Sequence, residues 1–195
     1  MGDEPDPFRP MLEAIDQGRL APGDFYPTHV NRNPDILEDI KSLDEATPVD
    51  LTASIQSDGK PLGKSISPSE AVVALLNAGV DLNRITLSSD ACGAIPVFDA
   101  DQNLTSIGIG MPNLVLAELI RMVRQQNIPL EQALCLVTAN PARILSLPGK
   151  GRIEVGCDAD LILFDEDFSI RYLMASGEMM IVDGKRLKFG IGETT

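Results

Sequence analysis

Apolar residues spaced three or four positions apart divide much of the chain into amphipathic helices. This period places side chains on one face of an α-helix. The predicted helices cover residues 7–18, 34–43, 68–79, 114–126 and 130–147. Four of them follow a capping residue, namely Asp6, Asn33, Ser67 and Asn113. In the last helix, Asn140-Pro141 predicts a break or a fresh start, because proline lacks the backbone N–H that a helix interior needs.

Short β-type runs alternate with these helices. The predicted strands are residues 25–30, 49–55 and 85–90, and residues 91–112, rich in Gly and Asp, are predicted to form one long loop. Strands that are each followed by a helix or a long loop indicate a parallel sheet, which carries its functional residues at the carboxyl ends of the strands. The pattern predicts an α/β fold, either a compact three-layer domain or part of a larger barrel.

The pattern changes after Pro148-Gly149. Short apolar runs at residues 153–155, 161–164, 172–175 and 179–182 are separated by Gly- and Asp-containing turn signals. We therefore predict two domains, an α/β domain at residues 1–148 and a small β module at residues 149–195.

Composition argues against several kinds of partner and site. The net charge of −13 argues against a nucleic-acid partner, because such contact depends on basic patches. No apolar run approaches the roughly 20 residues of a membrane-spanning helix, so no membrane partner is expected. Cys92, Cys135 and Cys157 show no CxxC spacing, so neither a disulfide framework nor a thiolate zinc site is predicted. We expect a reducing, cytoplasmic location.

Three side chains are candidates for chemistry. His29 ends the first predicted strand, although a single histidine is more often structural than a ligand. Asp90 ends the third strand, where a buried carboxylate needs a partner or a metal unless it simply caps a turn. Arg32 follows His29 and can hold a substrate carboxylate through two hydrogen bonds, although its spacing alone fits a surface arginine. Cys92 has no neighbouring histidine to activate it as a nucleophile.

Three segments together resemble the carboxyl-terminal half of an amidohydrolase-superfamily metal hydrolase, and most closely an isoaspartyl (β-aspartyl) dipeptidase. They are Tyr-Pro-Thr-His-Val-Asn-Arg-Asn at residues 26–33, Leu-Ser-Ser-Asp at residues 87–90, and the tail at residues 149–163. The tail alone is typical of the whole superfamily. The segment Thr-His-Val-Asn-Arg points to the dipeptidase.

The resemblance implies a fold and a set of roles. The fold would be the carboxyl-terminal part of a (β/α)8 TIM-type barrel with part of a small β-sandwich, and the full-length protein would be a homo-oligomer. Two zinc ions would activate a hydroxide that attacks a small β-aspartyl dipeptide substrate. His29 would bind one metal, and Asp90 would bind the other and carry the proton to the leaving amine. Arg32 would grip a substrate carboxylate.

The chain also departs from the family pattern. The family's His-x-His pair, its carboxylated lysine and a further ligand histidine lie upstream of the position of His29, and this chain has one histidine. A family serine four residues after the aspartate is replaced by Ala94. We therefore expect either a chain that starts at an internal methionine of a longer gene, or a truncated gene.

Two functional hypotheses follow. One is a metal-dependent dipeptidase, or another amidohydrolase acting on a cyclic amide or amine, whose site is incomplete in this chain. The other is a non-catalytic remnant that acts as an interaction protein. Half a barrel is also expected to leave an apolar interior and two sheet edges uncovered.

Overall fold

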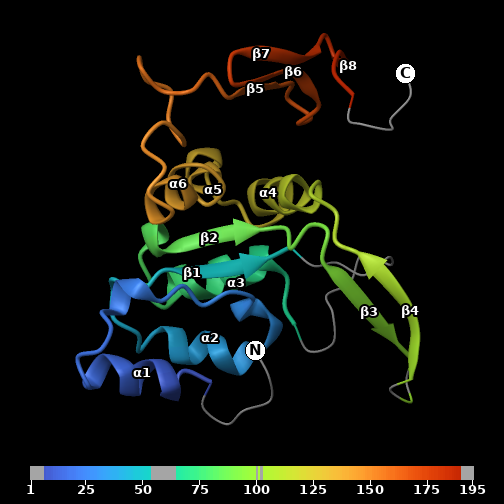
Figure 1. Cartoon of the computed structure of the whole chain (residues 1–195). Coiled ribbons are helices and arrows are strands. Elements are labelled where there is room, and N and C mark those ends of the chain that lie inside the picture. The colour runs from blue at the N-terminus through green and yellow to red at the C-terminus, as the bar shows by residue number, and fades with distance from the viewer. Residues whose placement is uncertain (1–6, 54–64, 100, 102, 190–195) are drawn as a thin grey trace. The chain divides into compact units, whose positions relative to one another are not determined.

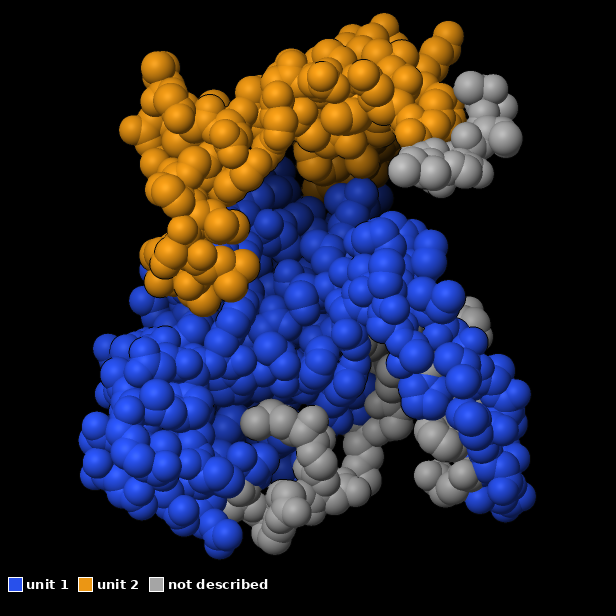
Figure 2. Space-filling model, in the orientation of Figure 1, with its two compact units in different colours: residues 1–141 blue, residues 142–195 orange. Residues whose placement is uncertain are grey.

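The computed structural model describes residues 7–53, 65–99, 101 and 103–189 (Figure 1). The chain divides into two compact units, Met1–Pro141 and Ala142–Thr195, which are coloured separately in Figure 2. The division between the units falls seven residues before the predicted domain boundary at residues 148 and 149. The assignment of a separate role to each predicted domain stays a prediction.

A two-stranded parallel sheet lies at the centre of the first unit. Strand β1 (Val49–Thr52) pairs with β2 (Ile85–Ser88) in a register that runs from Val49 opposite Ile85 to Thr52 opposite Ser88. Both strands were expected from their apolar runs, and their parallel pairing confirms the predicted mixed α/β character. The strands that the structure describes do not close into a barrel.

The first predicted strand, residues 25–30, is wrong. Residues 25–29 form no strand, although Pro27 O accepts a hydrogen bond of 2.8 Å from Asp50 N. Two features end any ladder here. Pro27 has no N–H to donate, and His29 adopts a left-handed backbone (φ 61°) that turns the chain into the short 3-10 helix η2 (Val30–Arg32).

Helices cover the apolar side of the sheet. Val49, Leu51 and Ile85 are fully buried, as is Leu75 of α3, and α3 contacts β1. The α-helices of this unit are α1 (Arg9–Asp16), α2 (Pro34–Ile40), α3 (Pro68–Asn77), α4 (Leu114–Gln125), α5 (Leu130–Cys135) and α6 (Ala139–Ile144), which runs on into the second unit; short 3-10 turns are η1 (Pro22–Asp24) and η3 (Leu82–Arg84). No helix among the described residues is both long and apolar enough to cross a bilayer.

Two predicted helix caps are confirmed. Asn33 Oδ1 accepts from Asp35 N (3.0 Å) at the start of α2, and Ser67 Oγ accepts from Glu70 N (3.3 Å) at the start of α3. Ser67 N in turn donates to Glu70 Oε2 (3.1 Å), which completes a capping box. The cap predicted at Asp6 lies outside the described residues.

One helix cap needs correction, and one predicted helix break is confirmed. Asn113 does not cap α4, because its backbone is itself helical (φ −68°, ψ −12°) and its side chain makes no capping bond. The break predicted at Asn140-Pro141 is confirmed, because the segment predicted over residues 130–147 forms two helices, α5 and α6, and α6 begins at Ala139. Pro141 thus lies in the first turn of α6, where its missing N–H costs no helical bond.

The predicted long loop at residues 91–112 instead contains an antiparallel hairpin. Its strands are β3 (Ala94–Phe98) and β4 (Leu104–Ile109), which extend away from the β1–β2 sheet in Figure 1. The Asp99 carboxylate accepts from Asp101 N and Asn103 N at 2.9 Å each and so builds the turn. Some of the Asp residues that suggested a loop therefore belong to the turn of a hairpin.

The second unit is a four-stranded antiparallel meander. Its order is β5 (Leu161–Phe164), β6 (Ile170–Ala175), β7 (Glu178–Val182) and β8 (Lys185–Arg186). The predicted run at residues 153–155 is not a strand, and Ile153 and Val155 are almost fully exposed. Lys150 pairs with Asp158 and Asp160 instead, and Asp160 also accepts from Ser176 N (2.7 Å), which ties this segment to the β6–β7 turn.

Candidate active site at the carboxyl ends of β1 and β2

One face of the parallel sheet is polar. Successive residues of a strand point to opposite sides, so Asp50 and Thr52 of β1 share a face with Thr86 and Ser88 of β2, opposite the apolar side. Asp50, Thr52 and Thr86 are buried, with at most 4% of their surface exposed. The face opposite Val49, Leu51 and Ile85 therefore carries a carboxylate and three hydroxyls.

Asp50 is the centre of this polar face. Its Oδ1 accepts from Thr86 Oγ1 (2.8 Å), and its Oδ2 accepts from Ser88 Oγ (2.6 Å) and, at 3.5 Å, from Thr52 Oγ1. Burial raises the pKa of the Asp50 carboxyl, while the three hydroxyl donors act in the opposite direction. Thr86 Oγ1 also makes a close hydrogen bond with the Tyr26 hydroxyl.

His29 lies beside the carboxyl end of β1. Its left-handed backbone immediately precedes η2, and its Nδ1 lies 2.5 Å from Thr52 Oγ1. Burial lowers the pKa of His29, as does the nearby Arg32 guanidinium, whereas the Asp90 carboxylate raises it. The three candidate side chains are therefore within electrostatic reach of one another.

Asp90 follows β2 by two residues and pairs with Arg32. Arg32 Nη2 donates to Asp90 Oδ2 at 2.8 Å, and each side chain is about one third exposed. The backbone at Asp90 is left-handed (φ 51°), and the base of the hairpin packs directly on it. A Cβ added to Gly110 would lie 2.3 Å from Asp90 O, so only glycine allows this approach.

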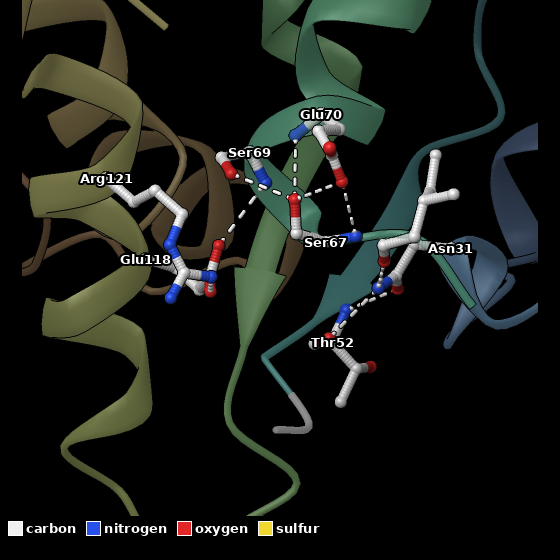
Figure 3. Close-up of polar contacts among 8 residues, drawn as sticks. Asn31, Thr52, Ser67, Ser69, Glu70, Glu118 and Arg121 are labelled. Carbon is white, nitrogen blue, oxygen red and sulfur yellow. Dashed lines mark hydrogen bonds and ion pairs between the residues drawn. The ribbon is translucent and has the colours of Figure 1, made fainter. Parts of the chain in front are cut away.

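Asn31 fixes the turn that carries His29 and Arg32 (Figure 3). Its Oδ1 accepts from Thr52 N (2.8 Å), and its Nδ2 donates to Thr52 O (3.1 Å) and Ile66 O (3.0 Å). Its own carbonyl accepts from Ile66 N (3.0 Å). The side chain is buried, so this amide joins the carboxyl end of β1 to the segment that leads into α3.

A second polar cluster lies at the start of α3, where Figure 3 shows Glu118 and Arg121 of α4 facing the Ser67–Glu70 capping box. Glu118 is fully buried, accepts from Ser69 N (3.4 Å) and pairs with Arg121. Burial raises the pKa of Glu118, and Arg121 and the Ser69 donors oppose this. The cluster joins α3 to α4.

The residue types at the site suit a metal only in part. An imidazole nitrogen and a carboxylate oxygen are zinc ligands, and His29 and Asp90 supply one of each. Among the described residues, no group of three or more His, Cys, Asp or Glu side chains could hold a metal ion. These two side chains alone therefore do not form a complete metal centre.

Sequence reasoning found three members of this cluster and missed the residues that hold them. His29, Arg32 and Asp90 lie together as expected, and their chemical roles stay predictions. Asp50 and Thr52 were missed, although the alternation of polar and apolar residues in β1 was a usable signal. Nothing local in the sequence marked the contacts of Asn31, because its partners are 21 and 35 residues away.

Solved structures of two other enzymes resemble this chain. A β-aspartyl dipeptidase from Fervidobacterium islandicum AW-1, solved in complex with a β-Asp-Leu dipeptide, matches with a TM-score of 0.83 and 27% identity. The match covers 97% of this chain and 48% of that one. An N-acetylglucosamine-6-phosphate deacetylase from Pasteurella multocida shares the fold at a TM-score of 0.59 and 16% identity, over 88% of this chain and 47% of that one.

The sequence relatives include dihydroorotases. A dihydroorotase from Methanosarcina mazei is 31% identical over 103 residues, which are 50% of this chain and 22% of the relative. The matched part of this chain thus covers about half the length of the solved dipeptidase and about a fifth of that dihydroorotase. The sequence pattern of the Amidohydrolase family matches residues 28–180, more than three quarters of the chain, and this chain therefore belongs to the amidohydrolase family.

Proposed function

We propose that this chain supplies the carboxyl-terminal share of the active site of a metal-dependent β-aspartyl dipeptidase. In this proposal, residues 1–148 are part of a (β/α)8 barrel and residues 149–195 are part of a small β-sandwich. The observation that carries the proposal is that His29, Arg32 and Asp90 lie together at the carboxyl ends of two parallel strands. The likeness to a dipeptidase solved with β-Asp-Leu supports the substrate class.

Arg32 is the proposed carboxylate-binding group. Its guanidinium already holds one carboxylate, that of Asp90, in a partly exposed position. A substrate carboxylate of the same geometry can replace this counter-ion, because a guanidinium binds carboxylates through two parallel N–H donors. A dipeptide whose aspartyl α-carboxylate reaches Arg32 would free Asp90 from the ion pair.

Asp90 is then the proposed proton carrier. Released from Arg32, its carboxylate can accept a proton from water and return it to the departing amine. His29 and Asp90 would bind zinc together with ligands outside this chain, and the metal would supply an acidic water molecule. The donor types fit this role, and the number of donors in the described residues does not complete it.

A cyclic amide is a second candidate substrate, favoured by the identity shared with dihydroorotases over half of this chain. The two candidates differ in the bond cleaved, which is an acyclic peptide bond in one and a ring amide in the other. Both substrates carry a carboxylate that Arg32 could hold. Assays with β-aspartyl-leucine and with dihydroorotate distinguish them.

The test compares this chain with a longer one that adds the upstream histidines and lysine of the family. Both are purified, loaded with zinc and assayed for hydrolysis of β-aspartyl-leucine. We expect turnover by the longer chain and none by this chain alone, because two ligands cannot fix two metals. No hydrolysis by the longer chain would contradict the proposed function, and equal turnover by both would show that the site is complete within this chain.

A further inference from the structure

Asp50 is a buried carboxylate that the proposed reaction does not use, and Thr52 connects it to His29. Asp50 is 4% exposed, and its oxygens contact the hydroxyls of Thr86, Ser88 and Thr52. An ionised carboxylate only accepts hydrogen bonds, whereas a hydroxyl donates one proton and accepts others. The direction of each bond around Asp50 can therefore be assigned by counting protons.

The hydroxyls of Thr86 and Ser88 lie nearest to the Asp50 carboxylate, and each donates its single proton to it. Thr86 gives its one proton to Asp50 Oδ1 at 2.8 Å, so its oxygen must accept from the Tyr26 hydroxyl. Ser88 likewise gives its proton to Asp50 Oδ2 at 2.6 Å. Both hydroxyl dipoles thus point towards the buried negative charge, which is the favourable orientation in a medium of low dielectric constant.

Thr52 connects this arrangement to His29. Its Oγ1 lies 3.5 Å from Asp50 Oδ2 and 2.5 Å from His29 Nδ1. If Thr52 gave its proton to Nδ1, its oxygen would face the carboxylate oxygen with no proton between them. If the Thr52 proton points to Asp50, the Thr52 oxygen accepts from Nδ1–H of His29. Each donor, the imidazole included, then points towards the Asp50 carboxylate, as the hydroxyls of Thr86 and Ser88 do.

We propose that Asp50, acting through Thr52, holds neutral His29 as the tautomer that is protonated on Nδ1. The Nε2 atom is then the ring nitrogen with a free lone pair. Asp50 and Thr52 are positioning residues in this scheme, since neither touches a substrate. Only the use of that lone pair, as a metal ligand, rests on the proposed function.

The single histidine of the chain makes the tautomer directly measurable. The complete 195-residue chain is labelled with ¹⁵N-histidine, stripped of metal and studied by NMR at about pH 8, above the ordinary histidine pKa of about 6.5. We expect Nδ1 to resonate as a protonated nitrogen and Nε2 as a bare one. Magic-angle-spinning spectra give the same two shifts if the chain associates. A wild-type spectrum with the proton on Nε2 would overturn the proposal, whatever the outcome of the dipeptidase assay.

Four variants test whether Asp50 and Thr52 set the tautomer of His29. Thr52→Val keeps the shape and removes the hydroxyl, so the two ¹⁵N shifts should move towards the Nε2-protonated pattern, and Thr52→Ser should restore the wild-type pattern. Asp50→Asn should move the shifts in the same direction as Thr52→Val, because an amide can donate to Thr52. Ser88 donates a hydrogen bond to Asp50 and none is made to His29, so Ser88→Ala should leave the two ¹⁵N shifts unchanged. Unchanged shifts in a folded Thr52→Val protein would overturn the proposal even if Asp50→Asn fails to fold.

Discussion

The guanidinium of Arg32 and the carboxylate of Asp90 form an ion pair with Nη2 and Oδ2 2.8 Å apart, although 58 residues separate them in the chain. Each side chain is about one third exposed, and such pairs contribute little to stability. The pair instead shows that the two groups proposed to meet the substrate already lie within hydrogen-bonding distance. Each serves as counter-ion to the other.

The first prediction concerns the geometry of that guanidinium. In the longer, zinc-loaded chain, Arg32→Lys should lower kcat/KM for β-aspartyl-leucine by about tenfold to a hundredfold, the loss of roughly 1.5–3 kcal/mol for a hydrogen bond to a charged group. An ammonium keeps the charge but cannot form two parallel bonds to a carboxylate. Steady-state kinetics measure the loss.

A matched control is available at Arg19, an exposed arginine outside the site. Arg19→Lys should leave kcat/KM unchanged. If Arg32→Lys also has wild-type kinetics, Arg32 does not bind the substrate carboxylate.

The second prediction follows from the lowered pKa of His29. The unfolded chain protonates this residue near pH 6.5, and the folded chain does so only at lower pH, so the unfolded state binds more protons between these two values. The free energy of unfolding should therefore rise with pH across this window and fall as the pH is lowered through it. Urea unfolding at a series of pH values measures the slope.

The variant His29→Gln isolates this contribution. Subtracting its unfolding free energies from those of the wild type removes the slopes that other groups cause. A difference that is flat, or that falls with rising pH, would mean that the histidine is not desolvated as the structure places it.

The third prediction compares two asparagines two residues apart. Asn31→Asp replaces the Nδ2 donor with an oxygen that faces Thr52 O and Ile66 O, and should lower the free energy of unfolding by about 2–4 kcal/mol. Asn33→Asp should be nearly neutral, because Asp caps a helix as well as Asn does. Denaturant unfolding of both variants at neutral pH gives the comparison. Equal losses would show that the hydrogen bonds of Asn31 Nδ2 to Thr52 O and Ile66 O do not stabilise the fold.

The fourth prediction concerns the buried Glu118. Burial raises its pKa, so the folded state binds more protons than the unfolded state between the ordinary value of 4.5 and the raised one. The contribution of Glu118 to stability should fall as the pH rises through this window. Glu118→Gln cannot titrate and should remove that part of the slope. If the slope is the same in both proteins, the carboxylate is compensated by Arg121 and the Ser69 donors more fully than its burial suggests.

The sequence by itself determined the elements whose causes are local. The starts of α2 and α3 follow from Asn33-Pro34 and Ser67-Pro68, since the capping side chain and the proline act within one helical turn. The strands at Val49–Thr52 and Ile85–Ser88 follow from β-type runs between turn residues. His29, Arg32 and Asp90 could be singled out because each follows or ends such a run.

Only the tertiary structure decided what surrounds these residues. Residues 25–29 have a strand-like composition, but Pro27 and the left-handed His29 prevent a ladder. The hairpin of β3 and β4 was hidden by turn residues whose role depends on the pairing of Ala94 with Ile109. Asp50 acquires its role only when the register of β1 and β2 brings Thr86 and Ser88 beside it. Hydrogen bonds between distant residues depend on which face of the sheet each side chain occupies and on the register of the strands, and a pattern of neighbouring residues specifies the first of these but not the second.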